Sequence, residues 1–377
     1  MKVNFVNYSR GYQAVREEVL NGIDEALSRG DVYLRGDVVE LEERIKKKCK
    51  VKECITTNSC TDSLFLSLYA LDLPPKSEVI TVGHTYISTI AAIVHNNLSP
   101  KLVDIGQDHN MDTEKMRAAI SKKTSAIIPV HLNGRMCEMD VIAEIAEEEG
   151  IAIVEDCAQS ITAEYGGKKA GVWGETGCFS FYPAKVLGAY GDAGCITTNN
   201  VDLAERLYLL RDNGEKPKYR MSAQDLLKRE IGLFGFNSVL DNIQAIILNI
   251  KIQKLEKAIG RRRAIAKRYC KEFKSVDLIL PPIDGEKRYD VFQNYVVQCN
   301  GTKERDSLEM YLKKQGVETL VSWRIPNHKQ KSLGIKAQLP NTEKISSSVL
   351  SLPMYPELSD QEVDYVCEKV LEWSKKC

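Results

Sequence analysis

A lysine and an acidic residue stand at two places in this sequence where their side chains could act together. Lys185 lies between a β-type segment, residues 178–182, and a glycine-rich turn. The pair Glu155-Asp156 comes directly after the apolar stretch 151–154. A lysine amine can condense with the aldehyde of pyridoxal phosphate, and a carboxylate can keep the pyridine nitrogen of that cofactor protonated. The two positions therefore predict a pyridoxal phosphate site with Lys185 as the catalytic amine.

Further polar and aromatic residues could complete such a site. Residues 57–62 follow a predicted strand and open a predicted helix, so their free backbone amides and the helix dipole would suit a phosphate. The hydroxyl of Ser180 could bind the same phosphate, and the ring of Tyr86 could stack on a flat cofactor. Each also has a simpler structural explanation: a helix cap for residues 57–62, a backbone hydrogen bond for Ser180, and core packing for Tyr86.

Elements that could position these residues alternate from residue 51 to residue 210. Repeated alternation of strands and helices predicts a largely parallel sheet that is covered by helices on both faces. The candidate residues then follow the carboxyl ends of successive strands, where open α/β sheets bind ligands. The last two strands follow each other closely, which predicts one antiparallel neighbour. The predicted strands are 54–57, 78–82, 101–105, 125–130, 151–155, 178–182 and 195–198, and the helices include 63–71, 113–120, 139–149 and 201–211.

The length of 377 residues allows two domains. We predict an α/β protein with a large cofactor-binding domain, residues 1–245, that begins with a helical segment. A small C-terminal α/β domain, residues 246–377, follows, and a long charged helix over residues 241–269 is expected to link the two. The predicted elements of the small domain are a strand at 294–299 and helices at 303–314 and 360–375.

The charge balance and the cysteine pattern exclude several classes of function. The 52 basic and 52 acidic side chains cancel, so we expect neither a nucleic acid nor a membrane as a partner. The 11 cysteines contain no CxxC pair and no histidine cluster, so we predict no metal site and no disulfide framework. Residues 1–7 lack the apolar core of a signal peptide, and we expect a reducing, cytoplasmic location.

Taken in order, six motifs resemble the DegT/DnrJ/EryC1/StrS family of sugar aminotransferases, which are pyridoxal phosphate enzymes of the aspartate aminotransferase fold (fold type I). The resemblance extends from residues 33–36 to residues 351–358, and the ordered set is far more specific than any single motif. It implies a mostly parallel sheet sandwiched by helices in a large domain, plus a small C-terminal α/β domain. The motifs are Asn58-Ser-Cys-Thr-Asp62, His84-Thr-Tyr-Ile-Ser-Thr89, Pro129-Val-His-Leu-Asn-Gly134, Glu155-Asp-Cys-Ala-Gln159, Phe179-Ser-Phe-Tyr-Pro-Ala-Lys185 and Gly191-Asp-Ala-Gly194.

The resemblance assigns cofactor roles to individual residues. It implies that Lys185 forms the Schiff base, that Asp156 pairs with the pyridine nitrogen, and that Gln159 lies near the phenolic oxygen. It also implies that the ring of Tyr86 stacks on the cofactor. The implied phosphate ligands are Ser180 and the backbone amides around Ser59, Cys60 and Thr61.

A homodimer with shared active sites is implied by the segment 235–241. The resemblance places Asn237 of this segment on the phosphate of the partner subunit's cofactor, which requires at least a twofold dimer. The family usually has arginine at the position of Val239, so one contact to substrate or partner is expected to be missing or replaced. Glycine is common at the position of Cys60, but a backbone-amide role survives that change.

The substrate side departs most from the family. Near residues 322–328 the family carries a His-Tyr-Pro type of run, from which Ser322 and Arg324 depart, while His328 keeps a familiar position. We expect Arg324 and His328 to contact the substrate. Arg35, Arg220 and Arg229 are further candidates for a diphosphate by chain position, although a surface role explains each of them better.

These assignments predict transfer of an amino group from an amino acid, glutamate, to a keto group of a nucleotide-linked sugar, with glutamate and 2-oxoglutarate as the donor pair. Such a reaction would serve amino-sugar, surface polysaccharide or glycoconjugate biosynthesis.

Three alternatives to this function stay open. One is an aminotransferase for a cyclitol or another non-nucleotide ketone, which no residue excludes. The second is a pyridoxal phosphate sugar dehydratase, although dehydratases of the family lack the lysine present here as Lys185. The third is a non-catalytic, cofactor-binding regulator, although no DNA-binding appendage is evident.

Overall fold

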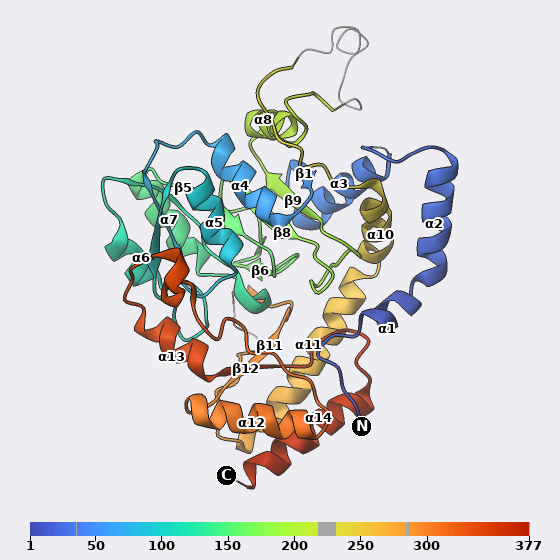
Figure 1. Cartoon of the computed structure of the whole chain (residues 1–377), viewed down its shortest axis with the longest axis vertical. Helices are drawn as coiled ribbons and strands as arrows, with labels where there is room; N and C mark the ends of the chain where they lie inside the picture. Colours follow the sequence, from blue (N-terminus) through green and yellow to red (C-terminus); the bar gives the residue numbers. More distant parts are fainter. Residues whose placement is uncertain (35, 218–230, 284, 286, 377) are drawn as a thin grey trace.

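The chain forms a large lobe around a central sheet and a small lobe on the C-terminal side, as seen in a computed structural model (Figure 1). The structure describes residues 1–34, 36–217, 231–283, 285 and 287–376. Helices α1 (Tyr8–Gln13), α2 (Arg16–Ser28) and α3 (Gly36–Cys49) confirm the prediction that the first fifty residues are helical. Within the described ranges, no helix combines the length and the apolar character needed to cross a membrane.

The central sheet has seven strands in the described part of the chain, in the order β1-β9-β8-β5-β4-β2-β3. β9 runs antiparallel to both of its neighbours, whereas the other strands run parallel to one another, so the predicted single antiparallel strand is confirmed. The strands are β1 (Glu53–Thr57), β2 (Glu78–Val82), β3 (Ser99–Val103), β4 (Thr124–Ile127), β5 (Ala152–Asp156), β8 (Thr176–Ser180) and β9 (Gly194–Thr198).

Both faces of this sheet are buried, which explains why its strands are apolar throughout rather than alternating. Val79 and Ala126 belong to one hydrophobic cluster, and their neighbours Ile80 and Ile127 belong to another. Successive residues of a strand point to opposite faces, so each strand contributes to both clusters. Helices on one face are α4 (Cys60–Ala70), α5 (Ile87–His95) and α8 (Val201–Arg211), and those on the other are α3, α6 (Thr113–Ala119) and α7 (Met139–Glu149).

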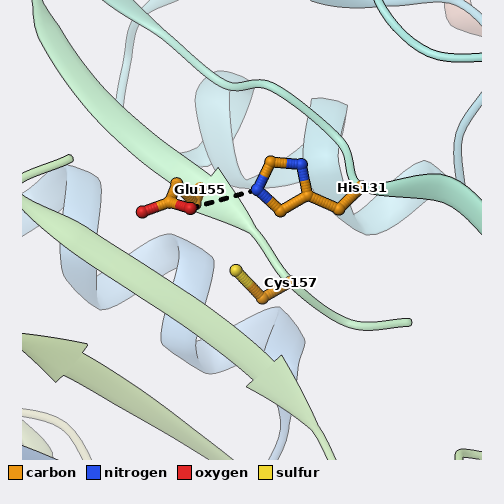
Figure 2. Close-up of side chains that lie close together, drawn as sticks. All are labelled: His131, Glu155 and Cys157. Atoms are coloured by element: carbon orange, nitrogen blue, oxygen red, sulfur yellow. Dashed lines mark hydrogen bonds and ion pairs between the residues drawn. The ribbon is translucent and has the colours of Figure 1, made fainter. Parts of the chain in front are cut away.

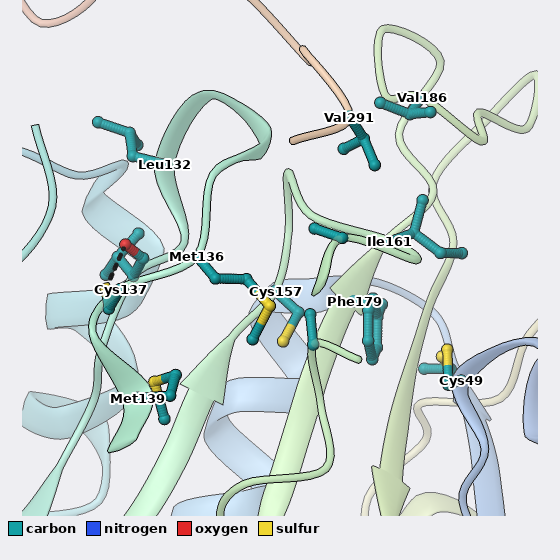
Figure 3. Packing of buried hydrophobic residues seen from close by; sticks show 14 of the residues in the cluster. Cys49, Leu132, Met136, Cys137, Met139, Cys157, Ile161, Phe179, Val186 and Val291 are labelled. Atoms are coloured by element: carbon teal, nitrogen blue, oxygen red, sulfur yellow. Dashed lines mark hydrogen bonds between the residues drawn. The ribbon is translucent and has the colours of Figure 1, made fainter. Parts of the chain in front are cut away.

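The second cluster extends from the sheet to the segments beside the predicted lysine (Figure 3). It includes Phe179 of β8, Val186, which follows Lys185, and Val291 from the far end of the chain. The backbone around Lys185 is therefore anchored in the main hydrophobic core rather than in a free surface loop.

The prediction of one continuous helix over residues 241–269 is wrong. The chain instead forms α10 (Asn242–Ile252) and α11 (Leu255–Glu272), with Lys254 outside helical geometry at φ −98° and ψ 0°. The break lets α10 bury its apolar residues against α2 and α3 while α11 runs from the large lobe to the small one (Figure 1). The predicted boundary at residue 245 lies inside α10, and residues as far as Ile259 still belong to the core of the large lobe.

The small lobe has its own core around the antiparallel pair β11 (Tyr295–Gln298) and β12 (Val349–Leu352). The predicted strand and the two predicted helices appear as β11, α12 (Thr302–Lys314) and α14 (Asp360–Ser374), whereas β12 and α13 (Pro340–Ser348) were not predicted. Val3 also packs in this core and pairs with Val317, so the first residues of the chain join the small lobe. A further small sheet joins β10 (Arg288–Tyr289) to β6 (Glu164–Tyr165) and β7 (Lys168–Lys169).

Candidate active site

A cavity of about 600 Å³ opens at the edge of the sheet where the parallel strands end. Most of the predicted cofactor residues line it, together with residues from both lobes. They come together because each follows or ends a strand: Ser59 follows β1, Tyr86 follows β2, and Asp156 and Ser180 end β5 and β8. The predicted residues on the cavity wall are Ser59, Cys60, Thr61, Tyr86, Asp156, Gln159, Ser180 and Lys185.

Asp156 is a buried acid that is fixed in one orientation. Thr89 Oγ1 donates to its Oδ2 at 2.8 Å, and the backbone N–H of Ala158 donates to its Oδ1 at 3.1 Å. Burial raises the pKa of the Asp156 carboxyl, although these two hydrogen bonds and the charge of Lys185 act against that effect. A carboxylate held in this way is stabilised by a cation placed in the cavity, and a protonated ring nitrogen is such a cation.

Lys185 projects into the same cavity from a short turn after β8. Its backbone N–H donates to the carbonyl of Tyr182 at 2.8 Å, and the N–H of Ala189 donates to the carbonyl of Phe181 at 2.7 Å, which closes the turn. Burial lowers the pKa of the Lys185 ammonium, while nearby Cys60 and Asp156 act in the opposite direction. The lowered pKa increases the fraction of neutral amine, which is the nucleophilic form.

The side-chain amide of Gln159 is oriented by a hydrogen bond to the backbone. Its Oε1 accepts a hydrogen bond of 2.7 Å from the backbone N–H of Asn133, which identifies this atom as the oxygen. The side-chain nitrogen is then the atom that can donate to a ligand on the cavity side. A phenolic oxygen is a suitable acceptor for such a donor.

The amino end of α4 and the start of β9 form a tight cradle. Ser59 caps the helix by accepting from the N–H of Asp62 at 3.1 Å, and the first amides of an α-helix have no partner inside it. Gly194 lies so close that a Cβ there would be 2.5 Å from the carbonyl carbon of Ser59 and 2.6 Å from the nitrogen of Cys60. Ser180 ends the neighbouring strand β8 and lines the cavity beside this cradle. Backbone amides at a helix start, with a hydroxyl beside them, suit a phosphate.

Together these features fit pyridoxal phosphate. The cavity offers an amine for the aldehyde, an acid for the ring nitrogen, an amide for the phenolic oxygen and a helix start for the phosphate. Tyr86, 64% exposed and lining the cavity, adds an aromatic ring. The burial of Asp156 is the most informative of these observations, because a buried acid gains most from a positive partner.

His131, Glu155 and Cys157 form a second buried group beside the cavity, with their ligand-type atoms all within 4.8 Å of one another (Figure 2). Glu155 accepts from His131 Nε2 at 3.0 Å and from the backbone N–H groups of Gly171, Trp173 and Gly174. The N–H of Cys137 donates to His131 Nδ1 at 3.2 Å, so Nε2 carries the proton that is directed at Glu155. The ligand-type atoms of His131 and Glu155 are therefore engaged in hydrogen bonds that fix the histidine at the cavity.

Arg324, His328 and Asn237, predicted to contact the substrate or the partner, do not line this cavity. Arg324 pairs with Asp306 at 3.2 Å and with Glu309 at 2.8 Å on the surface of α12. His328 is buried and contacts Glu343 through Nε2 at 3.1 Å. Their substrate roles stay predictions. Asn237 is exposed, Val239 is buried, and Arg35, Arg220 and Arg229 lie outside the described residues.

Comparison with known proteins decides the class of the molecule. A profile of the DegT/DnrJ/EryC1/StrS aminotransferase family matches residues 13–371. The chain belongs to this family. The resemblance that was inferred from the motifs is thus confirmed, and so is the enzyme class, an aminotransferase.

Individual relatives cover almost the whole of this aminotransferase. A protein of Aneurinibacillus thermoaerophilus named dTDP-3-amino-3,6-dideoxy-alpha-D-galactopyranose transaminase is 39% identical over 358 residues, which is 94% of this chain and 95% of its own. A Geobacillus stearothermophilus protein named pleiotropic regulatory protein is 38% identical over 381 residues, 99% of each chain. The solved structure of S. venezuelae DesV in complex with a ketimine intermediate has a TM-score of 0.93 at 32% identity, and the match covers 100% of this chain and 99% of DesV. The predicted fold class is therefore confirmed.

Several residues of the aminotransferase site were not identified from the sequence. Thr89 orients Asp156, and its position one helical turn after Tyr86 is a signal that could have revealed it. Gln293 and Asn294 line the cavity from the entry to β11, and Phe5 and Val6 line it from the start of the chain. No local pattern marks these four residues, because only the tertiary fold brings them to the cavity.

The cradle at Gly194 predicts that Gly194→Ala weakens cofactor binding. An added methyl would push the start of β9 away from the start of α4, at an overpacking cost of about 1–3 kcal/mol. The dissociation constant for pyridoxal phosphate, measured by absorbance titration of the cofactor-free protein, should rise about 10-fold. Gly260→Ala is the matched control, because no atom lies within 4 Å of a Cβ at that position of α11. Equal affinities for the two variants would show that the close approach does not shape the phosphate site.

The environment of Lys185 predicts how its reactivity depends on pH. Only the neutral amine attacks an aldehyde, so the rate at which pyridoxal phosphate is captured at Lys185 should rise with pH. Because burial lowers the pKa of this residue, the midpoint should fall below 10.5, the ordinary value for lysine. Stopped-flow absorbance of the cofactor-free protein would give the rate profile, with a lysine peptide as the reference. A midpoint at or above that of the peptide would contradict the proposed environment.

Proposed function

We propose that this aminotransferase binds pyridoxal phosphate at Lys185 and moves an amino group from an amino acid, glutamate, to a keto group of a nucleotide-linked sugar. The observation that carries the proposal is the meeting of Lys185 and the buried Asp156 in one cavity. The names of the relatives support the acceptor class, since one acts on a dTDP-linked amino sugar. Glutamate as the donor rests on the family resemblance alone.

The side chains of this site would divide the work among them. Pyridoxal phosphate, when bound, supplies an aldehyde that takes up the amino group and a ring that accepts an electron pair. Lys185 would move the proton from the α-carbon of the donor to the carbon that carried the aldehyde, acting first as base and then as acid. Asp156 would balance the positive ring nitrogen, and Gln159 would donate to the phenolic oxygen. The keto sugar would then react through the same steps in reverse order.

An apolar wall from the small lobe and the start of the chain would face the acceptor. Phe5, Val6, Val321, Trp323 and Met354 line the cavity. The wall is fixed, because Val3 pairs with Val317 and the N–H of Phe5 donates to Glu318 Oε2 at 3.1 Å. We propose that this wall contacts the sugar ring, whose carbon-bearing face is less polar than its hydroxyl edges.

We propose a homodimer with shared active sites, in which Asn237 reaches the cofactor phosphate of the partner subunit. Large apolar side chains are exposed on the cavity wall, at Tyr86 and Tyr182, and in the segment after residue 230, at Phe234. Tyr86 is 64% exposed, Tyr182 51% and Phe234 95%, and such side chains favour coverage by a partner.

We also propose that the protein is located in a reducing cytoplasm. This proposal agrees with the free thiols of all cysteines in the described part of the chain.

Catalysis is favoured over the other open alternatives. The dehydratases of the family lack the lysine present here, and Lys185 lies in the cavity with a lowered pKa, ready for chemistry. One relative is named pleiotropic regulatory protein, but that name states no reaction and does not argue against catalysis by this chain. An acceptor other than a nucleotide-linked sugar is left for the substrate assay to decide.

The proposal predicts that Lys185→Ala abolishes turnover and the visible absorbance of bound cofactor. Purified protein would be incubated with glutamate and then with a panel of nucleotide-linked 3-keto and 4-keto sugars. Wild-type protein should lose its visible absorbance with glutamate and regain it with one panel member, while Lys185→Ala does neither. Lys336→Ala, at an exposed position, is the control. Continued transamination by Lys185→Ala would refute the assignment, and a return of absorbance only with a non-nucleotide ketone would replace the acceptor.

The apolar wall predicts a selective effect for Phe5→Ala. Phe5 is half-buried, and a bound sugar would cover the rest of its ring. Removing the ring should raise KM for the keto sugar about 10-fold, because covering an aromatic ring contributes about 1.4 kcal/mol or more. The rate of the half-reaction with the amino donor should not change, because the small donor leaves this wall uncovered. Leu333→Ala, a position outside the cavity wall, serves as the control. An equal loss in both half-reactions would mean that Phe5 supports the fold rather than the sugar.

A further inference from the structure

Gln293 and Asn294 enter the cavity from the segment that leads into β11. This segment belongs to the small lobe, yet both side chains form hydrogen bonds to residues of the large lobe. Gln293 is 7% exposed, so its amide groups must be satisfied by the protein.

The amide of Gln293 holds the backbone on both sides of Lys185. Its Oε1 accepts from the N–H of Val186 at 2.8 Å, and its Nε2 donates to the carbonyl of Ala184 at 2.8 Å. A primary amide is the side chain that can accept and donate at once in this way. The peptide groups before and after the lysine are therefore tied to one side chain.

Asn294 is connected to Gln159, the residue predicted to contact the phenolic oxygen of the cofactor, through Asn133. Its Nδ2 donates to Oδ1 of Asn133 at 3.1 Å, and the backbone N–H of Asn133 donates to Oε1 of Gln159 at 2.7 Å. Asn133 has a φ of +59°, a left-handed conformation that needs support from its surroundings. Asn294 supplies part of that support and so fixes the direction of the Gln159 amide.

The backbone of the Gln293-Asn294 pair is held in place by contacts on both sides. Nη1 of the buried Arg262 donates to the carbonyl of Phe292 at 3.2 Å, of Gln293 at 3.3 Å and of Met354 at 2.8 Å. On the other side, the N–H of Val291 donates to the carbonyl of Gly134 at 2.9 Å. A Cβ at Gly134 would lie 2.8 Å from the nitrogen atoms of Phe292 and Gln293, so glycine permits this close approach.

We propose that Gln293 and Asn294 are positioning residues that set the geometry of Lys185 and Gln159 from the small lobe. The proposal rests on the proposed function, in which those two residues face the cofactor. It adds that the placement of the lysine depends on a side chain of the other lobe, so that the two lobes must be correctly packed for proton transfer. The side chains of Val186 and Val291 lie in the same hydrophobic cluster and pack beside the hydrogen bonds between Gln293 and the backbone around Lys185 (Figure 3).

Replacement of Gln293 should separate positioning from folding. Gln293→Met keeps the length of the side chain but removes both hydrogen bonds, whereas Gln293→Glu keeps the acceptor for Val186 and can donate to Ala184 only when it is protonated. Misplacement of a catalytic group by about 1 Å can cost about 100-fold in rate. We expect Gln293→Met to lower kcat in both half-reactions about 10- to 100-fold, with little change in KM.

Two readouts do not depend on turnover. In the cofactor-free protein, amide hydrogen exchange of a peptide containing Val186 should accelerate in Gln293→Met, because the bond to Gln293 is lost. In the loaded protein, the pH at which the absorbance of bound cofactor changes should shift, because Lys185 has moved. Gln293→Glu should approach the wild-type behaviour at low pH and depart from it as its carboxyl ionises.

Gln298→Glu is the matched control, since it places a carboxyl at an equally buried position on β11, away from Lys185. It should leave the absorbance titration and the exchange of Val186 as in the wild type.

The positioning role of Gln293 is overturned if Gln293→Met and the wild-type protein share the same absorbance titration and the same kcat. It is also overturned if Gln293→Glu and Gln298→Glu behave alike. If a Gln293 variant does not fold, Asn294→Ala tests the proposal instead. This variant should alter the absorbance titration through Gln159 and leave the amide exchange of Val186 unchanged. An unaltered titration would overturn the proposal. A wild-type protein that never takes up the cofactor would instead refute the proposed function.

Discussion

The burial of the Asp156 carboxyl is the constraint on which the rest of the site depends. An acid taken out of water must be neutralised or given hydrogen bonds and a positive partner, and its pKa is raised here despite the bonds from Thr89 and Ala158. A ring nitrogen that becomes cationic meets this need and gains, in turn, the electron-accepting character that amino transfer uses. In the proposed function, the other groups of the cavity hold the same ligand around this charge: Lys185 would bind its aldehyde, Gln159 its phenolic oxygen and the start of α4 its phosphate.

Much of this arrangement could be predicted from the sequence, because it depends on local order along the chain. Strands that alternate with helices place their carboxyl ends at one edge of the sheet, so Asp156, Ser180 and residues 59–61 had to lie near one another. The break between α10 and α11 could not be predicted in the same way. The sequence is helical in propensity throughout that stretch, and the turn at Lys254 is set by how α10 packs on α2 and α3.

Residues that depend on the meeting of the two lobes were also beyond sequence reasoning. Gln293 and Asn294 precede a short strand and belong to no periodic pattern, yet they reach the backbone beside Lys185 and the loop at Asn133. Phe5 and Val6 reach the cavity because Val3 pairs with Val317, more than three hundred residues away in the chain. The proposed cofactor residues are thus marked by local motifs, whereas the proposed acceptor wall is assembled by long-range packing. Specificity within a family that shares its motifs can vary through this second half.

The protonation state of the bound cofactor's ring nitrogen tests the account most directly. Nitrogen NMR of pyridoxal phosphate labelled with ¹⁵N at the pyridine position, bound to the wild-type protein, would report it without any substrate. Asp156 predicts the chemical shift of a pyridinium at neutral and mildly alkaline pH, and Asp156→Asn should move the signal toward that of the neutral ring. A neutral ring nitrogen in the wild-type protein at neutral pH would contradict the role given to the buried acid, and with it the chemistry assigned to the cavity.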